Sequence, residues 1–159
     1  MELRTDVFSI FDKKWALLTA GDMDKFNTMT ISWGGLGTLW NKPVATVYVR
    51  TSRYTHEFMD DKEYFTVSFY PESYRKALGE LGSKSGRDID KMHYEGLSAE
   101  KAGETEAVTF KEAELTLVCK KLFKEHISVD KIPSDVFEVL YKNDAPHDLY
   151  IAEVVDIIE

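Results

Sequence analysis

One stretch of this sequence, residues 25 to 55, constrains the fold more than any other. It contains no aspartate or glutamate, whereas even spreading of the chain's 28 acidic residues would place about five or six there. Residues 27–33 alternate hydroxyl and apolar side chains, and residues 44–50 are rich in β-branched side chains. These patterns predict two strands that form a hairpin, with the glycine-rich run 34–37 as a wide loop or bulge between them.

The end of the second predicted strand carries groups that bind anions. Arg50 and Arg53 flank Ser52, and Thr55 is the predicted N-cap of a short helix that continues to Met59. Arginine side chains, hydroxyls and the free N–H groups of a helix N-terminus are the components of a phosphate site. The same residues also fit an edge hairpin with solvated arginines, and spacing alone does not separate these two interpretations.

Hydrophobic periodicity and the positions of Gly and Pro predict the remaining elements. Strands are expected at residues 15–20, 64–69, 113–123 and 149–158, and residues 134–141 fit either a short helix or a strand. Helices are expected at residues 71–82 and 88–94, and residues 100–106 are expected to form a loop. This order predicts a mostly β, α+β fold: a β-barrel with short helices added to it.

Length and charge bound the function classes. The 159 residues suit a single domain, residues 1–159, that is large enough to bury a core. The net charge of −8 argues against nucleic acids and anionic membrane surfaces as partners, because both are bound by basic surfaces. No signal peptide and no apolar run of membrane-spanning length is expected. The single cysteine, Cys119, fits a reducing cytoplasm and is expected to be a buried, inert thiol.

Four motifs, in this order, resemble those of the flavin-reductase-like, FMN-binding split-barrel family, which includes flavoredoxin-type members. They are NTMTISWGG at residues 27–35, RTSRYT at 50–55, LGSKSGRDIDK at 81–91 and HDLYIAEV at 147–154. The resemblance covers nearly the whole chain. One departure is Ala152, since many family members place glycine before the glutamate of the last motif.

The resemblance implies a fold, a cofactor and an assembly. The fold is an FMN-binding split β-barrel, and the assembly is a homodimer with FMN at the subunit interface. Residues 29–32 would run along the isoalloxazine ring and the ribityl chain, and the arginine-containing turn at residues 50–55 would hold the phosphate. The implied cofactor-binding residues are Met29, Thr30, Ile31, Ser32, Trp33, Arg50, Ser52, Arg53, Tyr54, Thr55, Lys84, Ser85 and Arg87.

Some of these assignments are also compatible with a purely structural role. Lys84, Ser85 and Arg87 can contact a coenzyme phosphate or the flavin of the partner subunit, or they can be solvated residues of a mobile loop. His147, at the start of the last motif, is the candidate catalytic residue, because a neutral imidazole beside the flavin can orient substrate or supply a proton. The histidines lack metal-binding spacing, so no metal site is predicted, and the run 34–37 is not a dinucleotide-binding fingerprint.

The predicted function is that of an FMN-binding flavoprotein oxidoreductase. It would use NADH or NADPH to reduce flavin, or a small-molecule or protein acceptor, through bound FMN. The alternatives are a flavoredoxin-type electron-transfer protein that does not use nicotinamides directly, and a non-catalytic flavin-binding module. Discrimination between NADH and NADPH is expected to be weak, or to depend on residues 83–87, because no second domain is present to bind the adenosine end.

Overall fold

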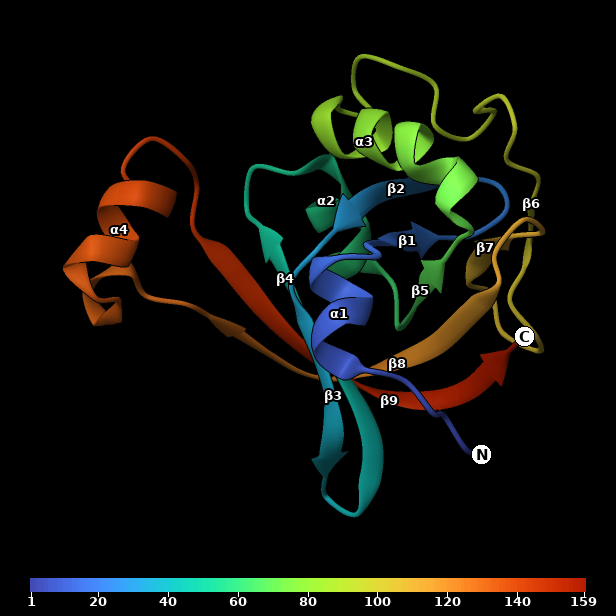
Figure 1. Cartoon of the computed structure of the whole chain (residues 1–159), viewed down its shortest axis with the longest axis horizontal. Coiled ribbons are helices and arrows are strands. Elements are labelled where there is room, and N and C mark those ends of the chain that lie inside the picture. The colour runs from blue at the N-terminus through green and yellow to red at the C-terminus, as the bar shows by residue number, and fades with distance from the viewer.

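A single curved antiparallel sheet forms the body of the protein in this computed structural model, which describes residues 1–159 (Figure 1). Its seven strands pair in the order β2-β1-β5-β8-β9-β4-β3. Their bounds are β1 Ala16–Gly21, β2 Phe26–Ile31, β3 Gly34–Leu39, β4 Lys42–Arg50, β5 Tyr64–Phe69, β8 Leu115–His126 and β9 His147–Ile158. Strands β6 Ala99–Lys101 and β7 Val108–Phe110 form a separate two-stranded sheet.

The two end strands of the seven-stranded sheet lie close together in space. Strands β2 and β3 stand at opposite ends of the strand order, yet only Ser32 and Trp33 separate them in the chain. Buried side chains of β2 and β4, among them Met29 and Val47, belong to one hydrophobic cluster. The sheet therefore curls into a barrel that stays open between β2 and β3. This arrangement confirms the predicted mostly β split barrel.

Strand β1 is buried at every position because both of its faces are covered. Leu18 points into the barrel and packs in the same cluster as Met29 of β2. Leu17 points the other way and packs with Leu78 and Leu81 of helix α3, Arg75–Ser83. The continuous apolar pattern of this strand thus reflects two cores, one inside the barrel and one beneath α3.

The remaining helices are short. They are α1 Val7–Asp12, α2 Tyr54–Asp61, α4 Ser134–Leu140 and the 3₁₀ segments Glu72–Tyr74 and Val129–Lys131. Helix α3 lies across β2, whereas α4 stands away from the barrel (Figure 1). None of the helices combines the length and the apolar character needed to cross a membrane.

An arm made of the end of β8, α4 and the start of β9 projects from the barrel (Figure 1). We define the arm as residues 122–148. Its two strands remain paired as far as His126 opposite Asp148. Helix α4 buries none of its residues, and Val139 on it is 81% exposed. The arm therefore presents apolar surface that nothing in the same chain covers.

A buried carboxylate, Asp148, holds the base of the arm. It accepts hydrogen bonds from His56 Nε2 at 2.6 Å and from His126 Nδ1 at 2.7 Å, and Lys124 Nζ lies 3.6 Å away. Burial alone would raise the pKa of this carboxyl, but the two histidines and Lys124 hold it below its ordinary value. The contacts tie α2, β8 and β9 together where the arm leaves the barrel.

The structure corrects two predictions about strands. The glycine-rich run 34–37 is not a loop, because it lies in β3, which pairs with β4. A Cβ atom on Gly34 would lie 2.6 Å from the Phe11 ring, so glycine allows α1 to pack directly on this strand. Residues 27–50 are not a hairpin either, since β2 pairs with β1 and β4 pairs with β3 and β9.

The predictions about helices are corrected in part. Arg53, not Thr55, is the N-cap of α2, and it makes no side-chain capping hydrogen bond. Residues 88–94 form turns rather than a helix. Residues 100–101 of the expected loop belong to the short strand β6. The ambiguous segment 134–141 contains helix α4. The strands predicted at residues 64–69 and 149–158 are confirmed as β5 and β9.

Candidate functional site

A pocket lies where the two end strands of the sheet meet. Its volume is about 160 Å³. The end of β2 and the link to β3 line one side, the end of β4 with the following turn lines another, and β9 contributes its first residue. The lining residues are Met29, Thr30, Ile31, Ser32, Trp33, Tyr48, Arg50, Arg53 and His147. Eight of the fourteen residues predicted for the site therefore lie together, although the predicted hairpin does not exist.

Arg50 connects the pocket to the arm. Its Nη1 donates a hydrogen bond to the carbonyl oxygen of Ala145 at 2.6 Å, and its Nε lies 3.3 Å from Asp144 Oδ2. The guanidinium also lies over the ring of Tyr141, 5.1 Å from the centroid. Arg50 thus fixes the loop between α4 and β9 while it contributes positive charge to the pocket.

Arg53 has one guanidinium nitrogen without a partner. Its Nη1 donates a hydrogen bond to the carbonyl oxygen of Gly82 at 2.9 Å, at the end of α3. Its Nη2 is shielded from solvent and makes no hydrogen bond. Burial lowers the pKa of Arg53, partly offset by Asp144, but a guanidinium stays protonated at neutral pH. A buried, unpaired N–H of a charged group is costly unless a ligand accepts its hydrogen bond, and an anion is the matching acceptor.

His147 is buried at the edge of the pocket. Its Nδ1 is hydrogen-bonded to the hydroxyl of Tyr141 at 2.8 Å, and its ring lies 5.4 Å from the Trp33 ring, centroid to centroid. Burial and the charge of Arg50 lower the pKa of His147 to about 4, and Asp144 opposes this shift only in part. The imidazole is therefore neutral at physiological pH, as its proposed role requires.

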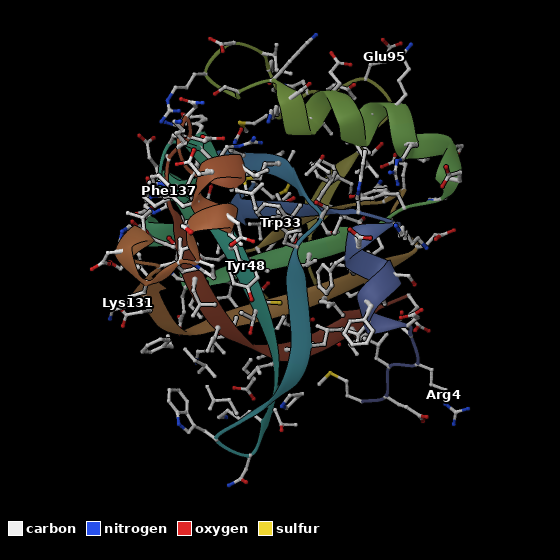
Figure 2. All side chains as sticks on the ribbon, turned by 60° about the vertical axis from the view of Figure 1, so that its left-hand side comes forward. Arg4, Trp33, Tyr48, Glu95, Lys131 and Phe137 are labelled. Carbon is white, nitrogen blue, oxygen red and sulfur yellow. The ribbon has the colours of Figure 1, made fainter.

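Two aromatic residues lie at the pocket: Trp33, which is 42% exposed, and Tyr48 on β4. Figure 2 shows both rings on the face where β3 and β4 pass in front of the barrel. Tyr48 was not predicted as a site residue. It stands two positions before Arg50 on the same strand, and that spacing places both side chains on one face of the sheet. The strand pattern therefore contained the signal that identifies Tyr48.

The other predicted residues lie outside the pocket. Thr55 is 1% exposed, and its hydroxyl accepts a hydrogen bond from Asn27 Nδ2 at 2.9 Å. Arg87 lies over the Tyr54 ring, 4.8 Å from its centroid, and its Nη1 and Nη2 contact the Ser52 carbonyl oxygen and Glu57 Oε1, each at 3.3 Å.

The side chains of the loop that follows α3 contact the loop itself and the adjoining helices α3 and α2. Lys84 pairs with Glu80 at 3.1 Å, and the Ser85 hydroxyl accepts a hydrogen bond from the Arg87 backbone N–H at 3.1 Å. With Arg87 against α2, this loop is packed on the N-terminus of α2. It lies beside the pocket, and none of its side chains lines it.

No group of three or more His, Cys, Asp or Glu side chains is placed to hold a metal ion. Cys119 is a free, buried thiol whose pKa is raised by burial. The pocket instead combines two arginines, a neutral imidazole, two aromatic rings and the free edge of β2. These groups suit an anionic ligand that has a planar aromatic part.

The family model described as "Flavin reductase like domain" matches residues 8–159. No curated protein sequence matches the chain.

Solved structures share the fold at low sequence identity. A flavoredoxin from Methanosarcina acetivorans is similar with a TM-score of 0.72 and 23% identity, over 100% of this chain and 74% of that chain. An FMN-binding protein from Thermus thermophilus, with bound p-hydroxybenzaldehyde, has a TM-score of 0.72 and 19% identity, over 100% and 80%. An NADH:FAD oxidoreductase from Streptomyces globisporus has a TM-score of 0.67 and 16% identity, over 92% and 74%.

Proposed function

Because the chain belongs to the flavin reductase like domain family, we propose that it is a flavoprotein oxidoreductase that binds FMN in the pocket between β2 and β4. One observation carries the proposal: Arg53 lines this pocket and has a buried Nη2 without a hydrogen-bond partner. A phosphate group supplies the acceptor that this nitrogen lacks. Riboflavin has no phosphate, so the protein should bind FMN more tightly than riboflavin.

The remaining pocket residues fit the other parts of FMN. Arg50, which also lines the pocket, would add a second positive charge beside the phosphate. Residues 29–32 present the end of an edge strand, whose free backbone groups can bond to the ring and the ribityl hydroxyls. Trp33 and Tyr48 provide aromatic surface for a planar ring. Bound FMN would supply the hydride and electron chemistry, while the protein holds it and limits access to one face.

His147 would act on the substrate rather than on the phosphate. Its neutral ring, held through Nδ1 by the Tyr141 hydroxyl, lies against Trp33 at the pocket edge. Its Nε2 can donate or accept one hydrogen bond, depending on the tautomer, and a neutral ring adds no further charge beside the flavin. We therefore keep His147 as the candidate residue for orienting substrate or transferring a proton.

We further propose that two copies of the chain complete each site. A pocket of about 160 Å³ is smaller than the ~300–1,000 Å³ of sites that enclose a drug-sized ligand. The arm adjoins the pocket through Arg50 and its contact with Asp144, and it exposes apolar side chains such as Phe123, Val129 and Val139. A second copy would cover this surface and the exposed side of the flavin. A chain that is monomeric at micromolar concentration and retains full FMN affinity would contradict this proposal.

The first experiment is a titration of the purified protein with FMN and with riboflavin, followed by the fluorescence of the free flavin. We expect quenching by micromolar protein, with tighter binding of FMN than of riboflavin. Failure to quench FMN would refute the proposed function. Equal affinity for the two flavins would show that the pocket does not bind the phosphate.

The electron donor requires a separate experiment. We propose NADH or NADPH as donor and a free flavin, another small molecule or a protein as acceptor. FMN-loaded protein would be mixed anaerobically with each nicotinamide, and flavin absorbance would be followed. Bleaching supports a reductase, bleaching only by a reduced iron–sulfur protein supports a flavoredoxin-type carrier, and no bleaching by any donor leaves a flavin-binding module.

Discrimination between the two nicotinamides should be weak. Arg87, the strongest candidate for binding a 2′-phosphate, is already paired with Glu57 and lies over the ring of Tyr54. Binding a 2′-phosphate would compete with these contacts, so the gain from a bidentate arginine is reduced. Arg87→Ala should therefore change the ratio of NADPH to NADH bleaching rates by less than roughly tenfold. A selective loss of NADPH turnover beyond that would place the 2′-phosphate at this loop.

The proposed location is the cytoplasm. Cys119 is a free thiol, and a chain with one cysteine forms no internal disulfide. Such thiols persist in reducing compartments. Fractionation of the source cells would test the assignment.

A further inference from the structure

Lys91, the last residue of the motif at residues 81–91, is buried without a carboxylate partner. Only 3% of its surface is exposed, and no acidic side chain lies within ion-pairing distance of its Nζ. Its Nζ donates hydrogen bonds to the carbonyl oxygens of Thr28 at 2.9 Å and Leu81 at 2.8 Å. A fully buried lysine without an anionic partner is rare, so its position requires an explanation.

Lys91 and Arg53 bind adjacent carbonyl groups at the same helix end. Lys91 bonds to the carbonyl oxygen of Leu81, and Arg53 bonds to that of Gly82. Both carbonyls belong to the last turn of α3, where backbone oxygens lack partners within the helix and the helix dipole is negative. Two cations therefore share the end of α3, and only one of them, Arg53, lines the pocket.

The second acceptor of Lys91 belongs to the strand that lines the pocket. Strand β2 pairs only with β1, so one of its edges has no strand partner, and Lys91 binds an oxygen of this strand at Thr28. Helix α3 approaches the same strand closely, since a Cβ atom on Gly82 would lie 2.9 Å from the Cβ of Thr30. The Thr30 hydroxyl also donates a hydrogen bond to the Leu78 carbonyl. Lys91 thus joins β2 to the helix end that holds Arg53.

We propose that Lys91 is a positioning residue for the phosphate site: by tying β2 to the last turn of α3, it keeps Arg53 bound to Gly82 through one nitrogen and free for phosphate through the other. This inference rests on the proposed binding of FMN. Lys91 does not touch the ligand, but its charge is unmatched in the protein alone and is balanced when a phosphate dianion binds beside Arg53. The motif at residues 81–91 then supports the phosphate site through its contacts with Arg53 and β2, without contacting the phosphate itself.

The electrostatics of Lys91 agree with this role. Burial, with the charge of Arg53 added, lowers the pKa of Lys91 to about 8. Arg53 is the one charged group that acts on it, and the groups facing it from β2 and α3 are the carbonyls of Thr28 and Leu81. A phosphate dianion nearby stabilises the ammonium form, so phosphate binding and protonation of Lys91 favour each other. Affinity for FMN should therefore fall as the pH rises above about 8.

The matched experiment measures the dissociation constants for FMN and riboflavin between pH 7 and 9.5. A phosphate monoester has its second pKa near about 6, so its charge is constant in this range. The isoalloxazine ring is common to both flavins, and its own titration cancels in their ratio. In the wild-type protein, the preference for FMN should fall by roughly three- to tenfold across the range, since one pKa unit corresponds to tenfold.

Three variants test the residue itself. Lys91→Met should weaken FMN roughly tenfold or more, change riboflavin less than about threefold and abolish the pH dependence of the preference. Lys91→Arg, which keeps the charge, should restore most of the FMN preference. Lys121→Met is the control. Lys121 lies on β8, away from the pocket, and it also donates from a partly buried site to a main-chain carbonyl, that of Met59. It should leave the preference unchanged.

The outcomes separate a failure of FMN binding from a failure of the role given to Lys91. If the wild-type protein does not bind FMN, the proposed function fails before Lys91 is tested. If it binds FMN but Lys91→Met weakens both flavins equally, Lys91 is only structural and the inference is overturned. If Lys91→Met does not fold, the wild-type titration decides, and a preference for FMN that is constant from pH 7 to 9.5 overturns the inference.

Discussion

Replacement of Arg53 by methionine separates ligand binding from folding. In the free protein the change removes one hydrogen bond from a charged group, Nη1 to the Gly82 carbonyl, worth about 1.5–3 kcal/mol. It also removes the buried, unpaired Nη2, whose desolvation costs about 1–3 kcal/mol. The two terms oppose each other, so the free energy of unfolding should change by about 2 kcal/mol at most.

The effect on FMN binding should be much larger. The variant loses at least one charge-assisted hydrogen bond to the phosphate, about 1.5–3 kcal/mol. At about 1.4 kcal/mol for each factor of ten, FMN should bind roughly 10- to 150-fold more weakly. Riboflavin should bind almost as before, because the lost contact is with a group that it does not have.

The assay combines urea unfolding with fluorescence titration of both flavins. Arg75→Met is the control, since Arg75 also donates to a main-chain carbonyl, that of Lys13, and lies on the ring of Trp15, away from the pocket. It should leave both flavin affinities unchanged. Two results would refute the reasoning about Arg53: an equal loss of FMN and riboflavin affinity, or unchanged affinity for both.

Three further predictions concern stability and reactivity. Gly82→Ala places a Cβ 2.9 Å from the Cβ of Thr30 and should destabilise the protein by about 1–3 kcal/mol, whereas Gly79→Ala, in the same helix with open space, should stabilise it by about 0.5–1 kcal/mol in urea unfolding. Asp148 has a pKa below its unfolded value of about 3.9, so its contribution to stability is present above that pH and is lost as the pH falls through the folded pKa. Asp148→Asn should therefore lower the free energy of unfolding at pH 7 and flatten its decline below about pH 4. An unchanged decline would show that Asp148 does not contribute to the pH dependence. Cys119 should react with a thiol reagent only after unfolding, because its thiol is buried with a raised pKa, and rapid labelling of the folded protein would contradict this.

Local patterns in the sequence were enough to predict most of the strands. The alternation in residues 27–33 and the β-branched run in residues 44–50 correspond to β2 and β4. A period of two is a property of each strand by itself, so it can be read without knowledge of the partners. The segment without acidic residues likewise marked Arg50 and Arg53, which line the pocket.

Predictions that required knowledge of packing failed. The glycines at residues 34–37 suggested a loop, but they lie in β3, and at Gly34 the absence of a side chain makes room for Phe11 of α1. Threonine is a residue type that is favoured at N-caps, but the hydroxyl of Thr55 is buried and bonded to Asn27. In both cases a contact from a distant part of the chain overrides the local preference.

The sequence by itself determined most of the strands, the faces of β2 and the two arginines of the turn, because these depend on neighbouring residues and on charge. Only the tertiary structure decided that β2 and β4, which are not paired, meet at one pocket, and that Lys91 is buried behind it. Lysine side chains are ordinarily exposed, so the sequence alone gives no reason to expect that Lys91 is buried. Its burial follows from the end of α3 and the free edge of β2, whose unpaired carbonyls come together where α3 packs across β2.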